Sequence, residues 1–442
     1  MTDAGTHATS GKPSGLQGIP RDRVTSAEPV YREARCCRLC GGGDLEIAIE
    51  LGRQCLTGVF PRNRDEEVPC GPLTLVRCET CGLVQLLHSY DPNVLYGSNY
   101  GYRSGLNRSM VEHLRAKVEE LRRLIPLHTG DVIVDIGSND GTTLSFYLPD
   151  KHVLVGFDPS AIKFREHYRH DMRLIADFFS AGAFRSEFGR STKAKVVTSL
   201  AMFYDLEAPL DFMRQVEEIL ADDGVWHFEQ SYLPSMLEAT AYDTICHEHL
   251  EYYAVRQIKW MTDRAGLKII ALSLNNVNGG SFAVTVTKRN APYPENEALV
   301  SGFLREEERL GLNGPDTYAR FRERVFRHRD ELRAHLHELR STGRSVMGYG
   351  ASTKGNVLLQ FCKLNEDVLP AIAEVNPHKF GCYTPGTRIP IISEKEAKAR
   401  RPDCFLVLPW HFKTNLLERE AEYVRGGGTM FFPLPHIHKV TR

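Results

Sequence analysis

Residues 132–142 read VIVDIGSNDGT, and this stretch decides the fold. Its first five residues are mostly β-branched, and Gly137 follows them directly, which predicts a buried parallel strand, a tight turn and then a helix. Asp135 near the strand end and the glycines at 137 and 141 let the backbone pass close beneath a ligand. The N–H groups that open the expected helix would bind a carboxylate. The alternative is an ordinary strand–turn–helix unit that binds nothing.

The spacing of the glycines indicates which ligand to expect. A dinucleotide loop carries G-x-G-x-x-G, whereas this turn holds only Gly137 and Gly141. The turn therefore suits a nucleoside that carries an amino acid, and we expect S-adenosylmethionine (SAM) as the cofactor. Its predicted contacts in and before the turn are Asp135, Gly137, Asn139, Asp140 and Gly141.

Polar residues also stand at the ends of the next predicted strands. The segment HVLVGFDPS places Asp158 about 20 residues past the first loop, where an acid usually holds a ribose diol. LIADFFS reads as a third strand with Asp177 at its tip, placed for an adenine amino group. The fourth strand, residues 196–199, ends at Ser199, and a fifth covers residues 225–229.

A helical pattern at residues 110–127 precedes the first strand, and another at 211–220 lies between the fourth and fifth. Asn278-Gly279-Gly280 joins two later strands as a hairpin. The alternation of strands and helices predicts an α/β fold, with a doubly wound parallel sheet that binds ligands at its carboxyl edge.

The length of 442 residues suggests about three domains. A net charge of −1 gives no support for a long nucleic-acid groove, and no apolar run approaches the roughly 20 residues that span a bilayer. Residues 1–34 lack the pattern of a secretion signal and are predicted to be a disordered tail, because their start is rich in Gly, Ser, Thr and Pro. We expect a cytoplasmic monomer that binds neither nucleic acid nor membrane.

Two Cys-x-x-Cys pairs, each followed by glycine, lie near the start of the chain. They are Cys37 with Cys40 and Cys78 with Cys81. The tight turns let four thiolates converge on one tetrahedral Zn²⁺, and such a site leaves no open position for a substrate. We therefore predict a structural zinc that folds a small domain. Buried cysteines without a metal are the alternative.

The neighbouring cysteines are interpreted as lying outside this site. Cys36 competes with Cys37, but its spacing to Cys40 is Cys-x-x-x-Cys, so Cys37 is preferred. Cys55 and Cys70 lie between the pairs and are interpreted as spare residues. Because disulfides are rare in the cytosol, the eleven cysteines are expected to be metal ligands, core residues or reactive thiols.

Residues 242–253, YDTICHEHLEYY, concentrate groups that can exchange protons. His247 and His249 flank Glu248, which is not the H-E-x-x-H spacing of a zinc protease. If the segment is extended, the two histidines face one side, and Cys246 and Glu248 face the other. A histidine near its usual pKa can take a proton at neutral pH. A polar surface loop is the alternative.

The last part of the chain predicts a second α/β unit. Residues 295–342 are strongly charged with spaced apolar positions, which indicates a pair of helices that link domains. A strand at 346–349 then runs into a glycine turn, and Lys354 opens a helix. This combination favours a phosphate, although it is not a Walker A loop. Further strands are expected around residues 372–377 and 405–410.

The order of these pieces resembles the sugar C-methyltransferase family. The motifs that carry the resemblance are CxxC…CxxC at 37–81, DIGSNDGT at 135–142, DTICHEHLEYY at 243–253, NGGS at 278–281, GYGASTKGN at 348–356, NPHKFGCYTPGTRIPI at 376–391 and LPW at 408–410. They extend over nearly the whole chain. The resemblance implies a zinc-binding domain (35–92), a class I SAM methyltransferase domain (93–295), and linker helices with a C-terminal Rossmann-like domain that binds a sugar nucleotide (296–442).

The activity that the resemblance implies is methyl transfer from SAM to a ring carbon, usually C3, of a nucleotide-linked 4-keto-6-deoxy sugar, with TDP as the expected nucleotide. A hydrogen beside a ketone leaves only when a base takes it and the enolate is stabilised. His249 is the predicted base, with Glu248 holding its orientation or charge and His247 in a structural role. Tyr100, in the aromatic loop at 96–104, is predicted to donate to the enolate oxygen or to position the sugar. A packed linker is the alternative for that loop.

Residues predicted to bind the sugar nucleotide come from several motifs. They are Tyr102, Asp205, Cys246, Asn278, Lys354, Asn356 and Tyr383. Lys354 would reach the diphosphate. Two positions depart from family members that act on 3-amino sugars: Cys246 stands where those carry Tyr, and Asp205 where they carry His. The identity of the sugar therefore stays open.

Two other functions stay open on the sequence. A SAM enzyme could methylate RNA through its zinc domain, but the neutral charge and the lack of a basic, aromatic-rich strand disfavour this. A non-catalytic binding protein could retain the cofactor fold, but it would have no need of the His-Glu-His segment.

Overall fold

The computed structural model describes residues 30–96 and 101–442. Four β-sheets organise these residues. Most of the predicted tail, residues 1–34, lies outside the described part, and so does Tyr100. Of the helices in these two ranges, none combines the length and the apolar character that crossing a membrane requires.

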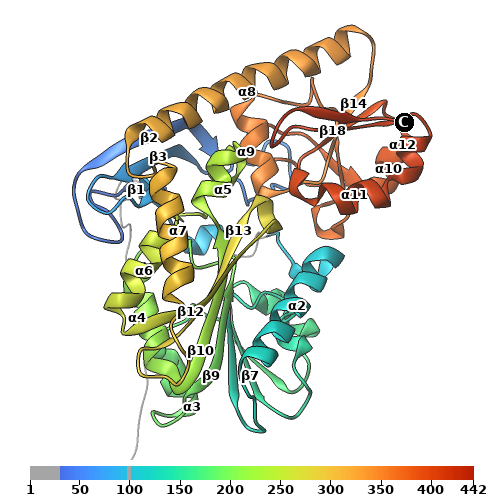
Figure 1. The fold of residues 1–442 in the computed structure, drawn as a ribbon. Coiled ribbons are helices and arrows are strands. Elements are labelled where there is room, and N and C mark those ends of the chain that lie inside the picture. The colour runs from blue at the N-terminus through green and yellow to red at the C-terminus, as the bar shows by residue number, and fades with distance from the viewer. Residues whose placement is uncertain (1–29, 97–100) are drawn as a thin grey trace, which may run out of the picture.

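A small antiparallel sheet forms the N-terminal module (Figure 1). In spatial order its strands are β11 (Glu251–Tyr252), β4 (Val84–Leu86), β3 (Cys70–Cys78) and β2 (Leu45–Cys55). Beside it, β1 (Tyr31–Glu33) pairs with β5 (His88–Tyr90). Strand β11 belongs to the His-Glu-His segment, so a piece of chain from far downstream completes this sheet.

The central sheet has seven strands in the order β12-β13-β10-β9-β6-β7-β8. They are β6 (Val132–Ile136), β7 (Val153–Phe157), β8 (Met172–Ile175), β9 (Ala194–Leu200), β10 (Leu220–Ser231), β12 (Leu267–Asn275) and β13 (Ser281–Lys288). β13 runs antiparallel to both neighbours, which confirms the predicted hairpin. The remaining pairs are parallel, as a doubly wound sheet requires.

Helices cover both faces of the central sheet (Figure 1). On one face, α2 (Arg108–Leu124) packs Val118 and Leu121 against Ile133 of β6. The helices of the other face are α3 (Ala181–Phe188), α4 (Pro209–Ile219) and α6 (Val255–Arg264). Val134 of β6 belongs to the core on that side. Because alternate side chains of β6 enter two cores, all of its residues are buried.

The prediction of an α-helix after the Gly137–Gly141 turn is wrong. The chain forms only a 3₁₀ turn, Leu144–Phe146, before β7. Asn139 and Gly141 hold positive φ angles of 50° and 75°, and a helix cannot continue through them. Pro149 then restricts the residues before it to extended conformations. No helix N-terminus therefore faces a ligand here.

Two helices lead to the C-terminal domain. They are α7 (Glu297–Arg309) and α8 (Pro315–Ser341), which confirm the predicted pair. The long α8 packs against β2 at one end and the C-terminal sheet at the other (Figure 1).

The C-terminal sheet has six strands in the order β16-β15-β14-β17-β18-β19. They are β14 (Val346–Tyr349), β15 (Ile372–Glu374), β16 (Ile391–Ser393), β17 (Cys404–Val407), β18 (Thr429–Phe432) and β19 (His438–Val440). The helices beside it are α9 (Thr353–Phe361), α10 (Glu394–Ala399), α11 (Lys413–Arg419) and α12 (Ala421–Arg425), and the two remaining short helices are α1 (Pro92–Leu95) and α5 (Leu233–Glu238). This second α/β sheet confirms the fold class.

The interpretation of Cys55 and Cys70 as spare residues is wrong, because the two form a disulfide. They face each other across the antiparallel pair β2–β3. The amide of Gln360 in α9 bonds the backbone of Cys55 twice, at 2.7 and 3.1 Å. The disulfide therefore lies where the N-terminal module meets the C-terminal domain.

Candidate active site between the two α/β sheets

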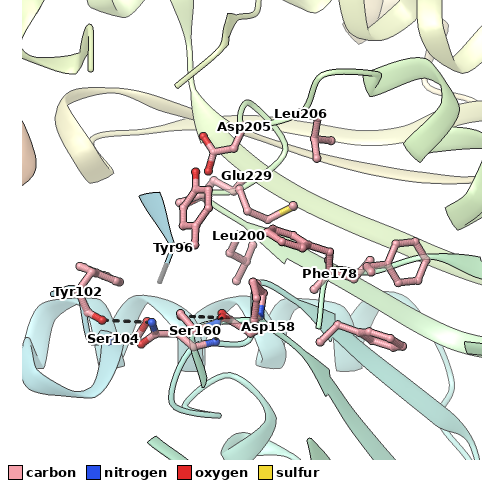
Figure 2. A pocket seen from close by; sticks show the side chains of 18 of the residues that line it. Tyr96, Tyr102, Ser104, Asp158, Ser160, Phe178, Leu200, Asp205, Leu206 and Glu229 are labelled. Carbon is pink, nitrogen blue, oxygen red and sulfur yellow. Dashed lines mark hydrogen bonds between the residues drawn. The ribbon is translucent and has the colours of Figure 1, made fainter. Parts of the chain in front are cut away.

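A cavity of about 340 Å³, here called the sheet cavity, opens at the carboxyl edge of the central sheet (Figure 2). Residues from the strand ends that line it include Gly137, Asn139, Asp158, Phe178, Phe179, Leu200, Asp205 and Glu229. The turn after β6 comes close to the opposite wall: a Cβ on Gly137 would lie 3.0 Å from Met202. With a φ of +76°, this position suits glycine.

Asp158 is the acid that the sequence predicts for a ribose, and it lies in the lining of the sheet cavity. One of its oxygens accepts the backbone N–H of Asn139 at 2.8 Å. The other accepts the backbone N–H and the hydroxyl of Ser160, at 2.7 and 2.6 Å. These donors fix the carboxylate at the end of β7, and its remaining lone pairs can accept hydroxyl groups.

The residues present fit SAM. Phe178, Phe179 and Leu200 give an apolar wall for a purine, and Asp158 offers acceptors for a ribose. Gly137 and Asn139 bring backbone close to the cavity, as predicted. When bound, SAM supplies an electrophilic methyl group.

Other predicted cofactor residues lie beneath or beside the cavity. Asp135 accepts the Thr198 hydroxyl at 2.6 Å, and burial raises its pKa to about 7. Ser199 accepts the indole N–H of Trp226 at 2.8 Å. Both support the strand ends from within the core and stay outside the lining.

Three further predicted residues also stay outside the lining of the sheet cavity. Asp140 accepts the guanidinium of Arg103 and turns its carboxylate away. Gly141 lies against the ring of Tyr168. Asp177 is exposed and accepts the N–H of the next residue. Its predicted contact with adenine stays a prediction.

A second cavity of about 220 Å³, the interdomain cavity, adjoins the first. Its lining includes Phe60 of the N-terminal module, then Tyr102, Asp205, Glu248, His249 and Asn278, and Ser352, Thr353, Lys354, Lys379 and His411 of the C-terminal domain. Tyr102, Asp205 and Asn278 line both cavities. A substrate in the interdomain cavity therefore lies directly beside the sheet cavity.

His249 has the geometry of a base. Its Nδ1 lies 2.9 Å from the carbonyl oxygen of Thr244. Because a carbonyl only accepts, Nδ1 carries the proton and Nε2 keeps a free lone pair. The ring packs on Tyr204, with ring centroids 4.1 Å apart. Burial and the charge of Lys354 lower the pKa of His249 to about 3, so the ring is neutral before substrate binds.

Glu248 does not hold the ring of His249, because the carbonyl of Thr244 occupies Nδ1. Its Oε2 accepts the hydroxyl of Thr57 at 3.5 Å. Its Oε1 is buried and has no hydrogen-bond partner within residues 30–96 and 101–442. Burial raises the pKa of Glu248.

His247 and His249 contact different parts of the molecule, because residues 247–248 form a turn instead of an extended strand. The expectation that both histidines face one side is therefore wrong. The His247 ring meets Tyr90 edge-on at 4.6 Å, and its Nδ1 lies 3.4 Å from the hydroxyl of Thr57. It is a contact with the N-terminal module, in agreement with a structural role.

Four of the predicted substrate residues, Tyr102, Asp205, Asn278 and Lys354, line the interdomain cavity. Three others do not. Cys246 and Asn356 are fully buried, and the Asn356 amide donates to the carbonyl of Thr57 at 2.8 Å. Tyr383 donates its backbone N–H to the carbonyl of Pro61 at 2.8 Å, which joins the C-terminal domain to the N-terminal module.

Cys37, Cys40, Cys78 and Cys81 form the predicted metal site. Their four Sγ atoms all lie within 4.8 Å of one another. Gly41 and Gly82, with φ angles of 75° and 72°, close the two Cys-x-x-Cys turns. The donor set and geometry fit a tetrahedral zinc. Cys36 is exposed and outside this cluster.

Comparison with known proteins agrees with this architecture. A zinc binding domain model matches residues 37–96, a methyltransferase domain model matches 108–272, and a model described as C-methyltransferase C-terminal domain matches 276–435. The C-methyltransferase NovU of Streptomyces niveus is 30% identical over 410 residues, which cover 92% of this chain and 97% of NovU.

The chain belongs to the C-methyltransferase family.

The protein is thus a SAM-dependent C-methyltransferase with a zinc-binding domain. Solved structures match the methyltransferase part. The plantazolicin methyltransferase BpumL in complex with SAH is 12% identical and covers 40% of this chain and 82% of that chain, with a TM-score of 0.32. The CurJ carbon methyltransferase is 12% identical and covers 42% of this chain and 57% of that chain, with a TM-score of 0.32.

Lys379 is a site residue of this C-methyltransferase that the sequence reasoning missed. Its ammonium donates to the carbonyl of Ala351 at 2.8 Å, just as Lys354 donates to the carbonyl of Asn278 at 2.7 Å. Within the described ranges, neither ammonium has a carboxylate within 4.0 Å. Burial lowers the pKa of both lysines. Lys379 lies in the motif at 376–391, but that motif does not show that Lys379 lines the same cavity as Lys354, which only the fold reveals.

Proposed function

We propose that this C-methyltransferase acts on a nucleotide-linked 4-keto-6-deoxy sugar and methylates a ring carbon beside the ketone. One observation carries the proposal: His249, whose Nε2 is left as an acceptor, shares a cavity with two half-buried ammonium groups, those of Lys354 and Lys379. A histidine acceptor serves to remove a proton from carbon. Two cations that have no carboxylate within 4.0 Å in the described ranges suit a diphosphate. TDP is the proposed nucleotide, and C3 is the proposed position.

In this proposal, His249 removes the proton from the carbon beside the ketone through Nε2. Burial, and to a lesser extent the charge of Lys354, keep the pKa of His249 low before substrate binds. A diphosphate beside Lys354 would compensate that charge and raise the basicity of the ring. In this proposal, binding of the substrate therefore makes His249 a stronger base. Tyr100 stays the predicted donor to the enolate oxygen, and it lies outside the described residues.

The interdomain cavity also allows the sugar and the diphosphate of one substrate to contact different domains. The sugar would lie against His249 and Asp205, close to the sheet cavity, and the diphosphate against Lys354 and Lys379 of the C-terminal domain. Because one chain supplies all of these groups, we propose that the enzyme acts as a monomer, and that it draws its sugar nucleotide from the cytoplasm.

The decisive experiment incubates the enzyme with SAM and a TDP-4-keto-6-deoxyglucose-type sugar in heavy water, followed by mass spectrometry. Gain of one methyl group is the expected result, and NMR of the product distinguishes C3 from C5, which both flank the ketone. Deuterium uptake without methylation would support the base and reject that sugar. Neither signal across several nucleotides would reject the proposed substrate class, and robust methylation of RNA would replace it.

A further inference from the structure

The loop after β9 places a carboxyl group where the two cavities meet. Asp205 lines the sheet cavity (Figure 2). It also lines the interdomain cavity. Its backbone N–H donates to the carbonyl of Met202 at 3.0 Å, which fixes the loop. Its Oδ1 is buried and has no hydrogen-bond partner in the part of the chain that the structure describes. One oxygen is therefore available where the sugar would meet the methyl donor.

A second buried carboxyl, that of Glu248, lines the same interdomain cavity. Only 5% of this residue is exposed. Gly58 lies so close that a Cβ there would fall 2.2 Å from Oε1, so the N-terminal module encloses the group tightly. Two carboxyl groups that share a desolvated wall do not both ionise easily, because like charges repel strongly where water is excluded.

Asp205 is the member of the pair placed to meet the reacting carbonyl. It lines both cavities, whereas Glu248 lines only the interdomain cavity and is held by Thr57. Burial raises the pKa of Asp205 well above its usual value; a hydrogen bond from Tyr96 lowers it, and the charge of Glu248 raises it further. Asp205 can therefore carry a proton at neutral pH.

We propose that Asp205 is a catalytic acid that protonates the carbonyl oxygen of the substrate while His249 removes the neighbouring C–H proton. This inference rests on the proposed function. It assigns to a described residue the stabilisation that an enolate requires, and it explains why a carboxyl group stands at the junction of the two cavities. Lys354 is less suited to this task, because its ammonium donates to the carbonyl of Asn278.

The proton balance closes over one turnover. The C–H bond breaks, its proton goes to His249, and its electron pair forms the C=C bond of an enol. The carbonyl oxygen takes the proton of Asp205, which becomes a carboxylate. The enol carbon then forms the new bond to the methyl group while the sulfur–methyl bond of SAM breaks and its electron pair stays on sulfur. The C=O bond returns, and the O–H proton goes back to Asp205. His249 releases its proton to solvent, so one proton leaves for each methyl gained.

The test compares Asp205→Ala and Asp205→Asn with the exposed control Asp222→Asn. We expect Asp205→Ala to lower kcat by about 100-fold or more, within the usual range for general acids. Asp205→Asn keeps an N–H donor and should lose about tenfold. Circular dichroism and thermal unfolding check that the variants fold. Because Asp205 also lines the sheet cavity, kcat is measured at saturating SAM.

The pH profile separates an acid from a residue that only shapes the cavity. An acid must be protonated, so wild-type kcat should fall as pH rises through the raised pKa of Asp205, and Asp205→Asn should lose this alkaline limb. Deuterium exchange of the sugar without SAM should slow in parallel with kcat.

Three results would overturn the acid role while wild type remains active: kcat of Asp205→Ala within threefold of wild type, a rise in KM alone, or an alkaline limb that persists in Asp205→Asn. If wild type itself neither methylates nor exchanges any 4-keto sugar nucleotide, the proposed function fails and the acid role fails with it. The two failures are therefore distinguishable.

Discussion

The two cavities of this enzyme are built in different ways. Strand ends of the central sheet form most of the sheet cavity, whose wall is largely apolar around the fixed carboxylate of Asp158. The interdomain cavity takes residues from all three parts of the chain, and it concentrates two histidines, two lysines and two carboxyl groups. The cofactor cavity is therefore built mainly on one sheet, whereas the cavity that we propose for the sugar depends on how the domains meet.

Removal of the metal should produce the largest difference between the two cavities: it should disrupt the interdomain cavity and largely spare the sheet cavity. Cys78→Ser deletes one of four thiolates, and structural zinc contributes about 10–16 kcal/mol of apparent binding free energy to folding. We expect loss of zinc, unfolding of the N-terminal module and loss of methyl transfer, because the interdomain cavity then loses Phe60 and the enclosure of Glu248. The central sheet should retain SAM affinity within about fivefold.

Metal analysis and calorimetry measure these two effects. Cys36→Ser is the matched control, because Cys36 is exposed beside the site and should leave zinc content unchanged. Full zinc content in Cys78→Ser would remove the four-cysteine assignment.

His249→Ala tests the interdomain cavity alone. Turnover should fall by about 10²–10⁴, the contribution of a general base, while SAM affinity stays constant because His249 lies outside the sheet cavity. Single-turnover kinetics and calorimetry measure the two quantities. His170→Ala, at an exposed histidine, is the control. Unchanged turnover in His249→Ala would exclude His249 as the base.

Asp158→Asn should have the opposite effect to His249→Ala: it should weaken SAM binding and leave proton removal from the sugar intact. SAM affinity should fall about 10- to 100-fold, as expected when a charged acceptor loses its hydrogen bonds. Deuterium exchange of the sugar without SAM should persist. Asp177→Asn provides a matched comparison: its exposed position predicts a change within about twofold. An equal loss of SAM affinity in Asp177→Asn would instead support its predicted contact with adenine.

Lys379→Ala should raise the KM for the sugar nucleotide about tenfold, because a diphosphate loses one charged hydrogen bond. SAM affinity and the deuterium exchange rate at saturating sugar should stay unchanged. Steady-state kinetics measure the effect, and the exposed Lys395→Ala is the control. A KM equal to that of wild type would remove Lys379 from the diphosphate site.

The smallest effect concerns the contact between His247 and the N-terminal module. Burial lowers the pKa of His247 to about 3 from a usual 6.5. Between these values the unfolded chain binds a proton that the folded chain does not. Folding stability should therefore fall as pH drops below about 6.5, by about 1 kcal/mol per pH unit. Urea unfolding at several pH values should show a shallower slope for His247→Gln, and equal slopes would contradict this.

The sequence predicts those features whose cause is local. The strand at 132–136, the hairpin turn at 278–280 and the two Cys-x-x-Cys turns each follow from neighbouring residues, and the structure contains all of them. Ligand positions at the sheet edge follow from topology, which is why Gly137 and Asp158 line the sheet cavity as predicted.

Features that depend on tertiary contacts cannot be predicted from local sequence patterns. The motif that contains Lys379 does not show that Lys379 shares a cavity with Lys354. The different contacts of His247 and His249 follow from a turn that an alternating pattern does not predict. The disulfide between Cys55 and Cys70 depends on the register of β2 against β3. Asp177 was placed by analogy with strand tips, but β8 ends at Ile175, before it.

Strand β11 couples the N-terminal module to the methyltransferase domain, so the module cannot be exchanged between relatives by itself. The segment that carries Glu248 and His249 continues directly into this strand, which pairs with β4 of the module. A chimeric enzyme that took residues 30–96 from a relative would therefore have to pair the relative's β4 with the original β11. To swap substrate preference by domain shuffling, the exchange must carry residues 242–253 together with the module.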